Sequence, residues 1–108
     1  MPKFLFTYRV PNVPLEQRLT ELGPAAGAGA ITLWDSWIES LGDHLLDHGN
    51  RVSDARMIGK CEGDTRSSGY TLITAASLDA AVTLARQCPF LDKGGGIEVG
   101  VIPEQVTP

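Results

Sequence analysis

The sequence lacks long apolar runs, cysteine-rich patterns and an excess of basic residues. No stretch approaches the roughly 18 apolar residues of a membrane-spanning helix, so we expect no membrane partner. The two cysteines, Cys61 and Cys88, form no CxxC pair, which excludes a disulfide scaffold and a zinc-finger spacing. Nine Lys and Arg residues against thirteen Asp and Glu give a net charge of −4. An acidic chain with scattered basic residues is poorly suited to binding nucleic acid.

The N-terminal segment also lacks the features of a signal peptide. Lys3 precedes a short apolar stretch, which Thr7, Tyr8 and Arg9 interrupt at once. A signal peptide needs an unbroken run of about 7–15 apolar residues and a small-residue cleavage site. We therefore expect a cytoplasmic protein whose cysteines are reduced.

What is present is enough apolar material for one folded domain. Of the 108 residues, 43% are hydrophobic and 20% are charged. This balance is typical of a chain that builds a core, and it differs from that of disordered chains. The length supports one ordinary domain and leaves little room for a second. We expect a single domain over residues 1–108.

Patterns of apolar residues predict four strands. In the first strand, Phe4, Phe6, Tyr8 and Val10 recur at every second position and so would share one face. A polar hairpin loop is expected at residues 61–69. The four strands are expected at residues 3–10, 52–60, 70–75 and 97–102.

Two main helices are predicted between these strands. The first, over residues 30–44, has apolar residues spaced three or four apart, which favours an amphipathic helix. The second follows Ser77, a good N-cap, and is ended by Pro89. Its apolar stripe is expected to be Leu78, Ala81, Val82 and Ala85. A short additional helix is expected at residues 15–22. The glycine-rich stretch at residues 23–30 is either a flexible joint or the start of the first main helix.

The resulting order is β-α-β-β-α-β, with the short helix added. This is the order of the ferredoxin-like α+β fold, which has a four-stranded antiparallel sheet with both helices on one face. The opposite face would carry Leu5, Leu72 and Ile102. Because large exposed apolar patches usually mark an interface, we expect a homodimer that covers this face.

Residues 69–102, GYTLITAASLDAAVTLARQCPFLDKGGGIEVGVI, resemble the YCII-related family, also called DGPF-domain proteins. Members have a GY strand, an LDxAxxLA helix, a CP turn and a glycine-rich approach to an IEV strand. Residues 34–50, WDSWIESLGDHLLDHGN, and the opening KFLFTYR are similar to the family's W-xx-W helix and first strand. The resemblance covers most of the chain and implies a dimeric α+β barrel. Where many members have Asp-Gly-Pro-Phe, this chain has KCEGDTRSSGY, so a role for that turn does not carry over.

Two histidines near the end of the first main helix could carry chemistry. His44 and His48 are four residues apart and would share a face of one continuous helix, which suits a divalent metal. One His with a nearby Asp could instead do acid–base work, or both could be surface histidines. We take His44, Asp47 and Tyr70 as candidate catalytic residues, and we expect neither a metal nor a cofactor.

The aromatic residues allow two interpretations. Trp34 and Trp37 are three residues apart, so they either pack in the core or form the wall of a pocket between helix and sheet. Tyr8 and Tyr70 could supply hydroxyl groups to such a pocket. We take Tyr8, Trp34 and Trp37 as candidate ligand-binding residues.

The primary functional hypothesis is a dimeric barrel that binds an unknown small molecule. By analogy with the fold, it extends to a cofactor-free enzyme of the lyase, isomerase or monooxygenase type. One alternative is a non-catalytic dimeric module for interaction or regulation. Another is a metal or haem binder that uses His44 or His48.

Overall fold

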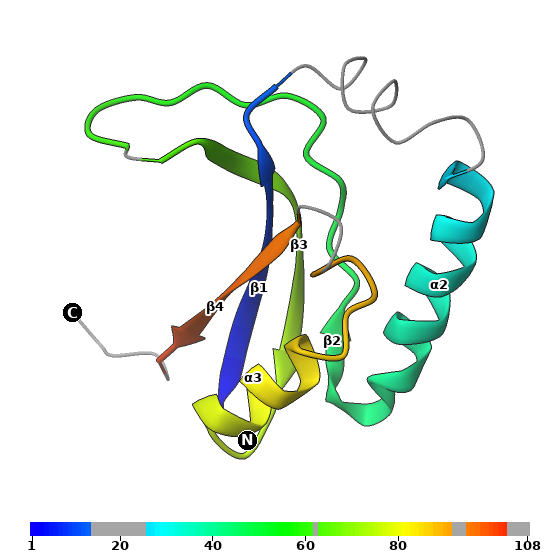
Figure 1. The fold of residues 1–108 in the computed structure, drawn as a ribbon. Helices are drawn as coiled ribbons and strands as arrows, with labels where there is room; N and C mark the ends of the chain where they lie inside the picture. Colours follow the sequence, from blue (N-terminus) through cyan, green and yellow to red (C-terminus); the bar gives the residue numbers. More distant parts are fainter. Residues whose placement is uncertain (14–25, 62, 92–94, 104–108) are drawn as a thin grey trace.

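Four strands and two α-helices make up the described part of the chain, which is residues 1–13, 26–61, 63–91 and 95–103 of a computed structural model (Figure 1). The element order is β1 (Lys3–Pro11), α2 (Ala26–Ser40), the 3-10 helix η1 (Gly42–His44), β2 (Leu45–Asp47), β3 (Thr65–Thr74), α3 (Leu78–Ala85) and β4 (Gly96–Ile102).

β1 is a central strand of a four-stranded antiparallel sheet with the order β2-β3-β1-β4. It pairs with β3 on one side and with β4 on the other, and β2 extends the sheet beyond β3. Because each neighbouring pair is antiparallel, β1 and β2 run in the same direction with β3 inserted between them. β2 and β4 are the edge strands.

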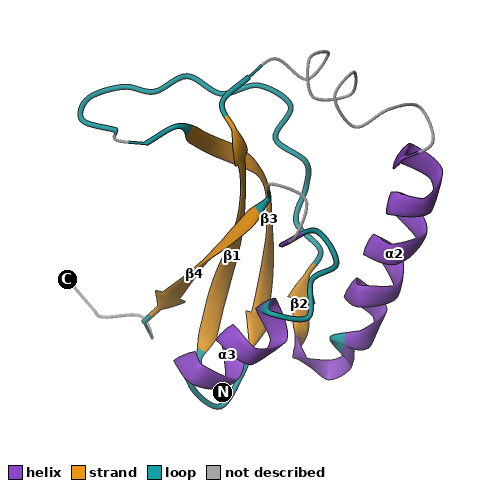
Figure 2. Ribbon diagram, viewed as in Figure 1, coloured by secondary structure: helices purple, strands orange, loops and turns teal. Residues whose placement is uncertain are grey.

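The core lies on one face of this sheet, and both helices cover that face (Figure 2). Phe4 and Phe6 of β1 are 2% and 0% exposed, which confirms the predicted alternation of the first strand. Burial of such side chains is the dominant favourable contribution to folding. The helices add to the same cluster Trp37, Ile38 and Leu41 from α2, and Ala81 and Ala85 from α3.

The first main helix was predicted four residues too late at both ends. It begins at Ala26, so the described part of the glycine-rich stretch is a helix start, one of its two predicted states. It ends at Ser40 and not at His44, because Gly42 has a φ of +53°. This left-handed conformation breaks the helical hydrogen bonding, and glycine adopts it without steric cost.

The second main helix starts as predicted. The Oγ of Ser77 accepts a hydrogen bond of 3.1 Å from the backbone N–H of Ala80, which caps the first turn. The helix ends at Ala85, before Pro89 is reached. The predicted short helix at residues 15–22 lies outside the described residues.

The second strand was predicted in the wrong place. Residues 52–60 contain no strand, and β2 is instead Leu45–Asp47, directly after the residues predicted to be helical. Apolar and polar residues alternate poorly in this segment, and its two largest apolar side chains, Met57 and Ile58, are 45% and 88% exposed, so they do not pack in the core. β3 begins at Thr65, earlier than predicted, because it pairs with β1 as far as Pro11.

The face of the sheet away from the helices carries four apolar side chains, which we call the open sheet face. Leu5 is paired with Leu72 in the register of β1 and β3, and Ile102 lies on β4 opposite Lys3. Leu46 of β2 is 49% exposed. The open sheet face is thus Leu5, Leu46, Leu72 and Ile102.

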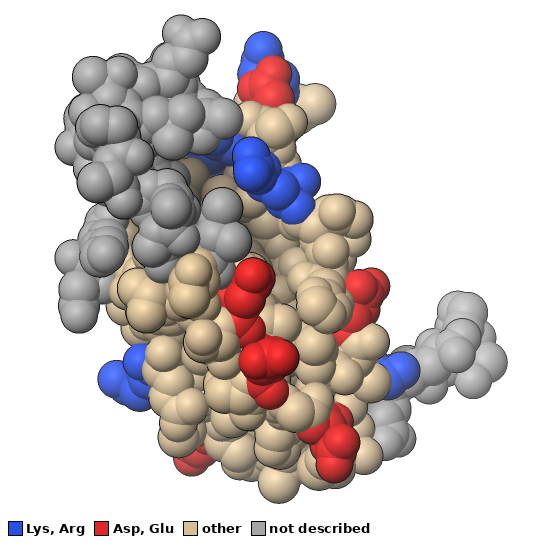
Figure 3. Space-filling model, turned by 90° about the vertical axis from the view of Figure 1, so that its right-hand side faces the viewer, with Lys and Arg blue, Asp and Glu red and all other residues tan. Residues whose placement is uncertain are grey.

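Exposed acidic side chains gather on the side of the molecule that carries α2. Acidic groups lie over the middle of the face that carries α2 (Figure 3), and Asp35, Glu39 and Asp43 are exposed. No helix among the described residues is both long enough and apolar enough to cross a membrane.

The same substitution at a buried and at an exposed isoleucine tests the position of the core. We expect Ile73→Val to lower the free energy of unfolding by about 0.5–1.5 kcal/mol, since it removes a methyl group from a packed site. Ile58→Val should change it by less than about 0.5 kcal/mol. Urea unfolding of both variants measures the difference, and equal losses would place the core elsewhere.

Candidate binding site

The three predicted ligand-binding aromatics come together between α2 and the sheet. The Tyr8 and Trp34 rings meet edge to face with centroids 4.7 Å apart, and the Trp34 and Trp37 centroids are 5.4 Å apart. Trp37 is 4% exposed, and its indole N–H donates to the carbonyl of Leu84 at 3.2 Å. Trp37 is therefore a core residue that holds α2 against α3. Trp34 is partly exposed and also contacts Phe90.

Tyr8 begins a directional chain of hydrogen bonds. Its hydroxyl lies 2.5 Å from the Oγ1 of Thr71, and that hydroxyl donates to the backbone carbonyl of His48 at 2.9 Å. A threonine hydroxyl has one proton, and a carbonyl can only accept. Tyr8 must therefore donate to Thr71, which leaves its own proton engaged and ties β1 through β3 to the segment after β2.

Burial raises the pKa of the Tyr8 phenol well above its ordinary value of 10.0. The folded protein thus keeps the neutral phenol to a higher pH than the unfolded chain does. Above about pH 10 the unfolded chain loses this proton while the folded protein keeps it, so stability falls as the pH rises. Tyr8 is held as a hydrogen-bond donor and is poorly suited to act as a base.

Removing the Tyr8 hydroxyl should change how stability depends on pH. At pH 7, Tyr8→Phe should cost about 0.5–1.5 kcal/mol, the usual net contribution of a hydrogen bond. Above about pH 10, the wild-type protein should lose up to about 1.4 kcal/mol per pH unit more steeply than Tyr8→Phe, so the two curves converge. Urea unfolding from pH 7 to pH 11 measures both effects, and parallel curves would contradict the assignment.

The predicted catalytic residues lie on three elements, His44 in η1, Asp47 in β2 and Tyr70 in β3. The Nδ1 of His44 lies 2.9 Å from the carbonyl oxygen of Thr74, and because a carbonyl can only accept, Nδ1 donates this hydrogen bond. Tyr70 is four residues away from Thr74, or about 13 Å along an extended strand. The structure does not bring His44 and Tyr70 together. Asp47 accepts a hydrogen bond of 2.9 Å from the backbone N–H of Gly49.

Gly49 explains how the chain packs beside Tyr70. It has a φ of +71°, and a Cβ at this position would lie 1.7 Å from the carbonyl oxygen of Tyr70. Only a glycine allows this close approach. Asp47 and Tyr70 are therefore both neighbours of Gly49, although no hydrogen bond joins their described side chains.

The two histidines do not lie on one helix. α2 ends at Ser40, His44 ends η1, and His48 follows β2 as an exposed residue. The geometry on which the metal interpretation depended is therefore wrong. Among the described residues, no three His, Cys, Asp or Glu side chains are grouped as metal ligands.

Both cysteines are free thiols in this structure. Cys88 is 7% exposed and belongs to the core, and burial raises the pKa of its thiol. A protonated, buried thiol behaves as a small apolar side chain, which favours a packing role for Cys88.

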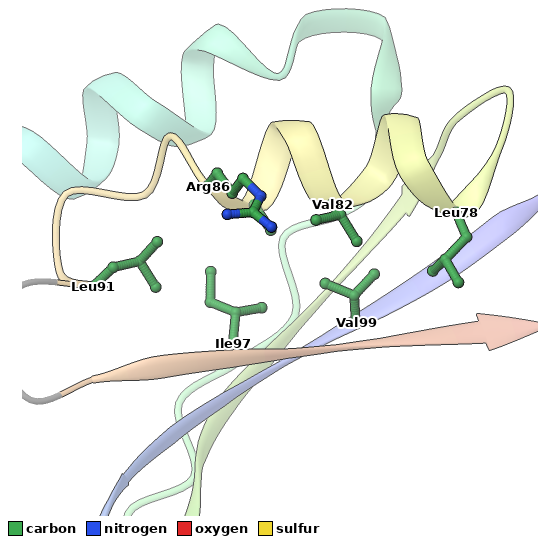
Figure 4. A pocket seen from close by; sticks show the side chains of 7 residues that line it. Leu78, Val82, Arg86, Leu91, Ile97 and Val99 are labelled. Atoms are coloured by element: carbon green, nitrogen blue, oxygen red, sulfur yellow. The ribbon is translucent and has the colours of Figure 1, made fainter.

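A groove of about 380 Å³ runs between α3 and the edge strand β4 (Figure 4). α3 forms one wall and β4 the other, with the turn after α3 closing one end. Six of the seven lining side chains are apolar, and the seventh is an arginine. The lining residues are Leu78, Val82, Ala85, Arg86, Leu91, Ile97 and Val99.

The sequence of α3 explains why this groove is open. Ala81 and Ala85 are 0% and 5% exposed, so the helix presses its small side chains onto the sheet. Leu78 and Val82 lie one turn apart on the side facing β4, and Leu78 is 44% exposed. All four were predicted to form a single apolar stripe of this helix. The spacing that could have predicted the groove is that of Leu78, Val82 and Arg86, which are four residues apart and so form a separate ridge along the helix.

No family model matches this sequence, and no curated protein matches it. The resemblance to the YCII-related family therefore stays a prediction.

Proposed function

We propose that this chain is a small-molecule-binding protein whose ligand lies in the groove between α3 and β4. The observation that carries the proposal is the groove itself: about 380 Å³ of space with an almost wholly apolar lining and one charged group. Ligand sites are typically concave, of about 300–1,000 Å³, and apolar with a few polar groups that fix orientation.

Binding is favoured over catalysis by the chemistry of the lining. The apolar side chains cannot exchange protons, and an arginine stays protonated, so it cannot serve as a base. The candidate catalytic residues His44, Asp47 and Tyr70 do not line the groove. A cofactor-free lyase, isomerase or monooxygenase activity is thus the second candidate, and it would need a different site near β3.

Filling the groove should weaken the binding of an apolar probe. Val82→Phe places a larger side chain between α3 and β4, so we expect it to weaken binding of the neutral fluorophore Nile red at least tenfold. Thr83→Phe is the matched control, because Thr83 is exposed on the same helix and does not line the groove. Fluorescence titration measures both. Equal affinities for both variants, or no binding by the wild-type protein, would contradict the proposal.

We also propose that the protein is a cytoplasmic, ferredoxin-like homodimer of the YCII-related type. The strand order, with β3 inserted between the parallel β1 and β2, supports the ferredoxin-like arrangement. The open sheet face supports the dimer, because Leu46 is 49% exposed and Leu5 and Leu72 lie beside each other. A second copy of the same face would cover these side chains.

A charge on the open sheet face should separate the two copies. We expect the wild-type protein to have twice the chain mass in light scattering at micromolar concentration, and Leu72→Lys to have the mass of one chain. Thr83→Lys carries the same charge on exposed helix surface and should stay dimeric. A wild-type monomer would reject the dimer and would favour a module whose open sheet face binds a different protein.

A further inference from the structure

We propose that the groove between α3 and β4 selects amphipathic monocarboxylates, in which an unbranched apolar chain ends in a carboxylate. The proposal rests on the proposed function, because it names the class of ligand for the same site. Its basis is the placement of one cation, Arg86, toward one end of an otherwise apolar channel.

The groove has a direction set by α3. Leu78, Val82 and Arg86 are spaced four residues apart, so they form one line along the helix. From Leu78 to Arg86 this line is about 12 Å long at 1.5 Å per residue. In Figure 4, Leu78 lies at one end of the groove, the guanidinium of Arg86 reaches over Ile97 toward the other end, and Leu91 closes that end. An elongated ligand with one polar end matches this shape.

The guanidinium of Arg86 is available to an anion. Among the described residues, the side chain of Arg86 makes no hydrogen bond and no ion pair; the ion pair found there joins Arg56 and Asp54. Arg86 also follows the last residue of α3, where the carbonyl groups carry partial negative charge. That end of the groove would repel an anion without Arg86, so the guanidinium is what makes a carboxylate favourable there.

A neutral ligand of the same length gains less from this arrangement. A planar guanidinium can bind both oxygens of a carboxylate in parallel hydrogen bonds, whereas a hydroxyl offers it a single acceptor. Because Arg86 is exposed, water and salt weaken the attraction, so the preference should be about three- to tenfold. In the absence of the guanidinium, the neutral ligand should bind better, since a carboxylate is more costly to desolvate.

The experiment compares decanoate with decanol as competitors for Nile red at pH 7.5, both below the concentration at which they aggregate. We expect the wild-type protein to bind decanoate about three- to tenfold more tightly than decanol, and this preference to shrink as salt is added. Arg86→Gln should reverse the order, and Arg86→Lys should keep only part of the preference, because it keeps the charge but loses the parallel pair of hydrogen bonds. Arg56→Gln is the control, because its side chain is 78% exposed and lies outside the groove.

The outcomes separate this inference from the proposed function. If Nile red does not bind, the proposed function fails. If Nile red binds but decanoate has no advantage, or if Arg86→Gln keeps the advantage, the groove stands and the carboxylate preference is wrong. If decanoate changes the chain's oligomeric mass without displacing Nile red, a second copy occupies the groove. If the protein sediments with anionic phosphatidylglycerol vesicles but ignores monomeric decanoate, the occupant is a membrane surface. Either of these last two results would overturn the inference.

Discussion

Burial of one face of β1 is the constraint on which the rest of the structure depends. Phe4 and Phe6 are almost fully buried, and they occupy a strand with neighbours on both sides. β3 and β4 complete the hydrogen bonding of β1, and α2 and α3 exclude water from its aromatic side. Because side chains alternate along a strand, burying Phe4 and Phe6 also sends Leu5 to the opposite face. The core and the open sheet face therefore have a common origin.

The groove follows from the same packing. α3 can approach the sheet closely because alanines face the aromatic core. Its larger side chains, Leu78 and Val82, then lie toward β4, which is the edge of the sheet. No further strand of the described chain lies beyond β4 to fill this space. The helix ends near Arg86, so a positive charge falls toward one end of an apolar channel.

The sequence predicted the helices and strands that have a clear apolar periodicity or a clear capping residue. β1, α3 with its Ser77 cap, and β4 were each located to within a few residues, because their apolar periodicity and capping signals act locally. β2 was missed because Leu45 continues the helical spacing of the apolar residues before it. The left-handed conformation of Gly42, which separates the helix from the strand, is not specified by that spacing. The groove could not be predicted at all, since it depends on how closely α3 approaches β4. The aromatic cluster of Tyr8, Trp34 and Trp37 was anticipated as a group, but its division into core and partly exposed members needed the three-dimensional packing.

The most direct test of the binding groove is a methyl NMR titration of the protein with decanoate. The groove and the open sheet face both carry methyl groups, so one spectrum reports on both surfaces. We predict shifts at Val82, Leu91 and Val99, which line the groove, while the methyl groups of Leu5 and Leu72 stay unchanged. Shifts at Leu5 and Leu72 with none in the groove would contradict the account and place the apolar ligand on the sheet.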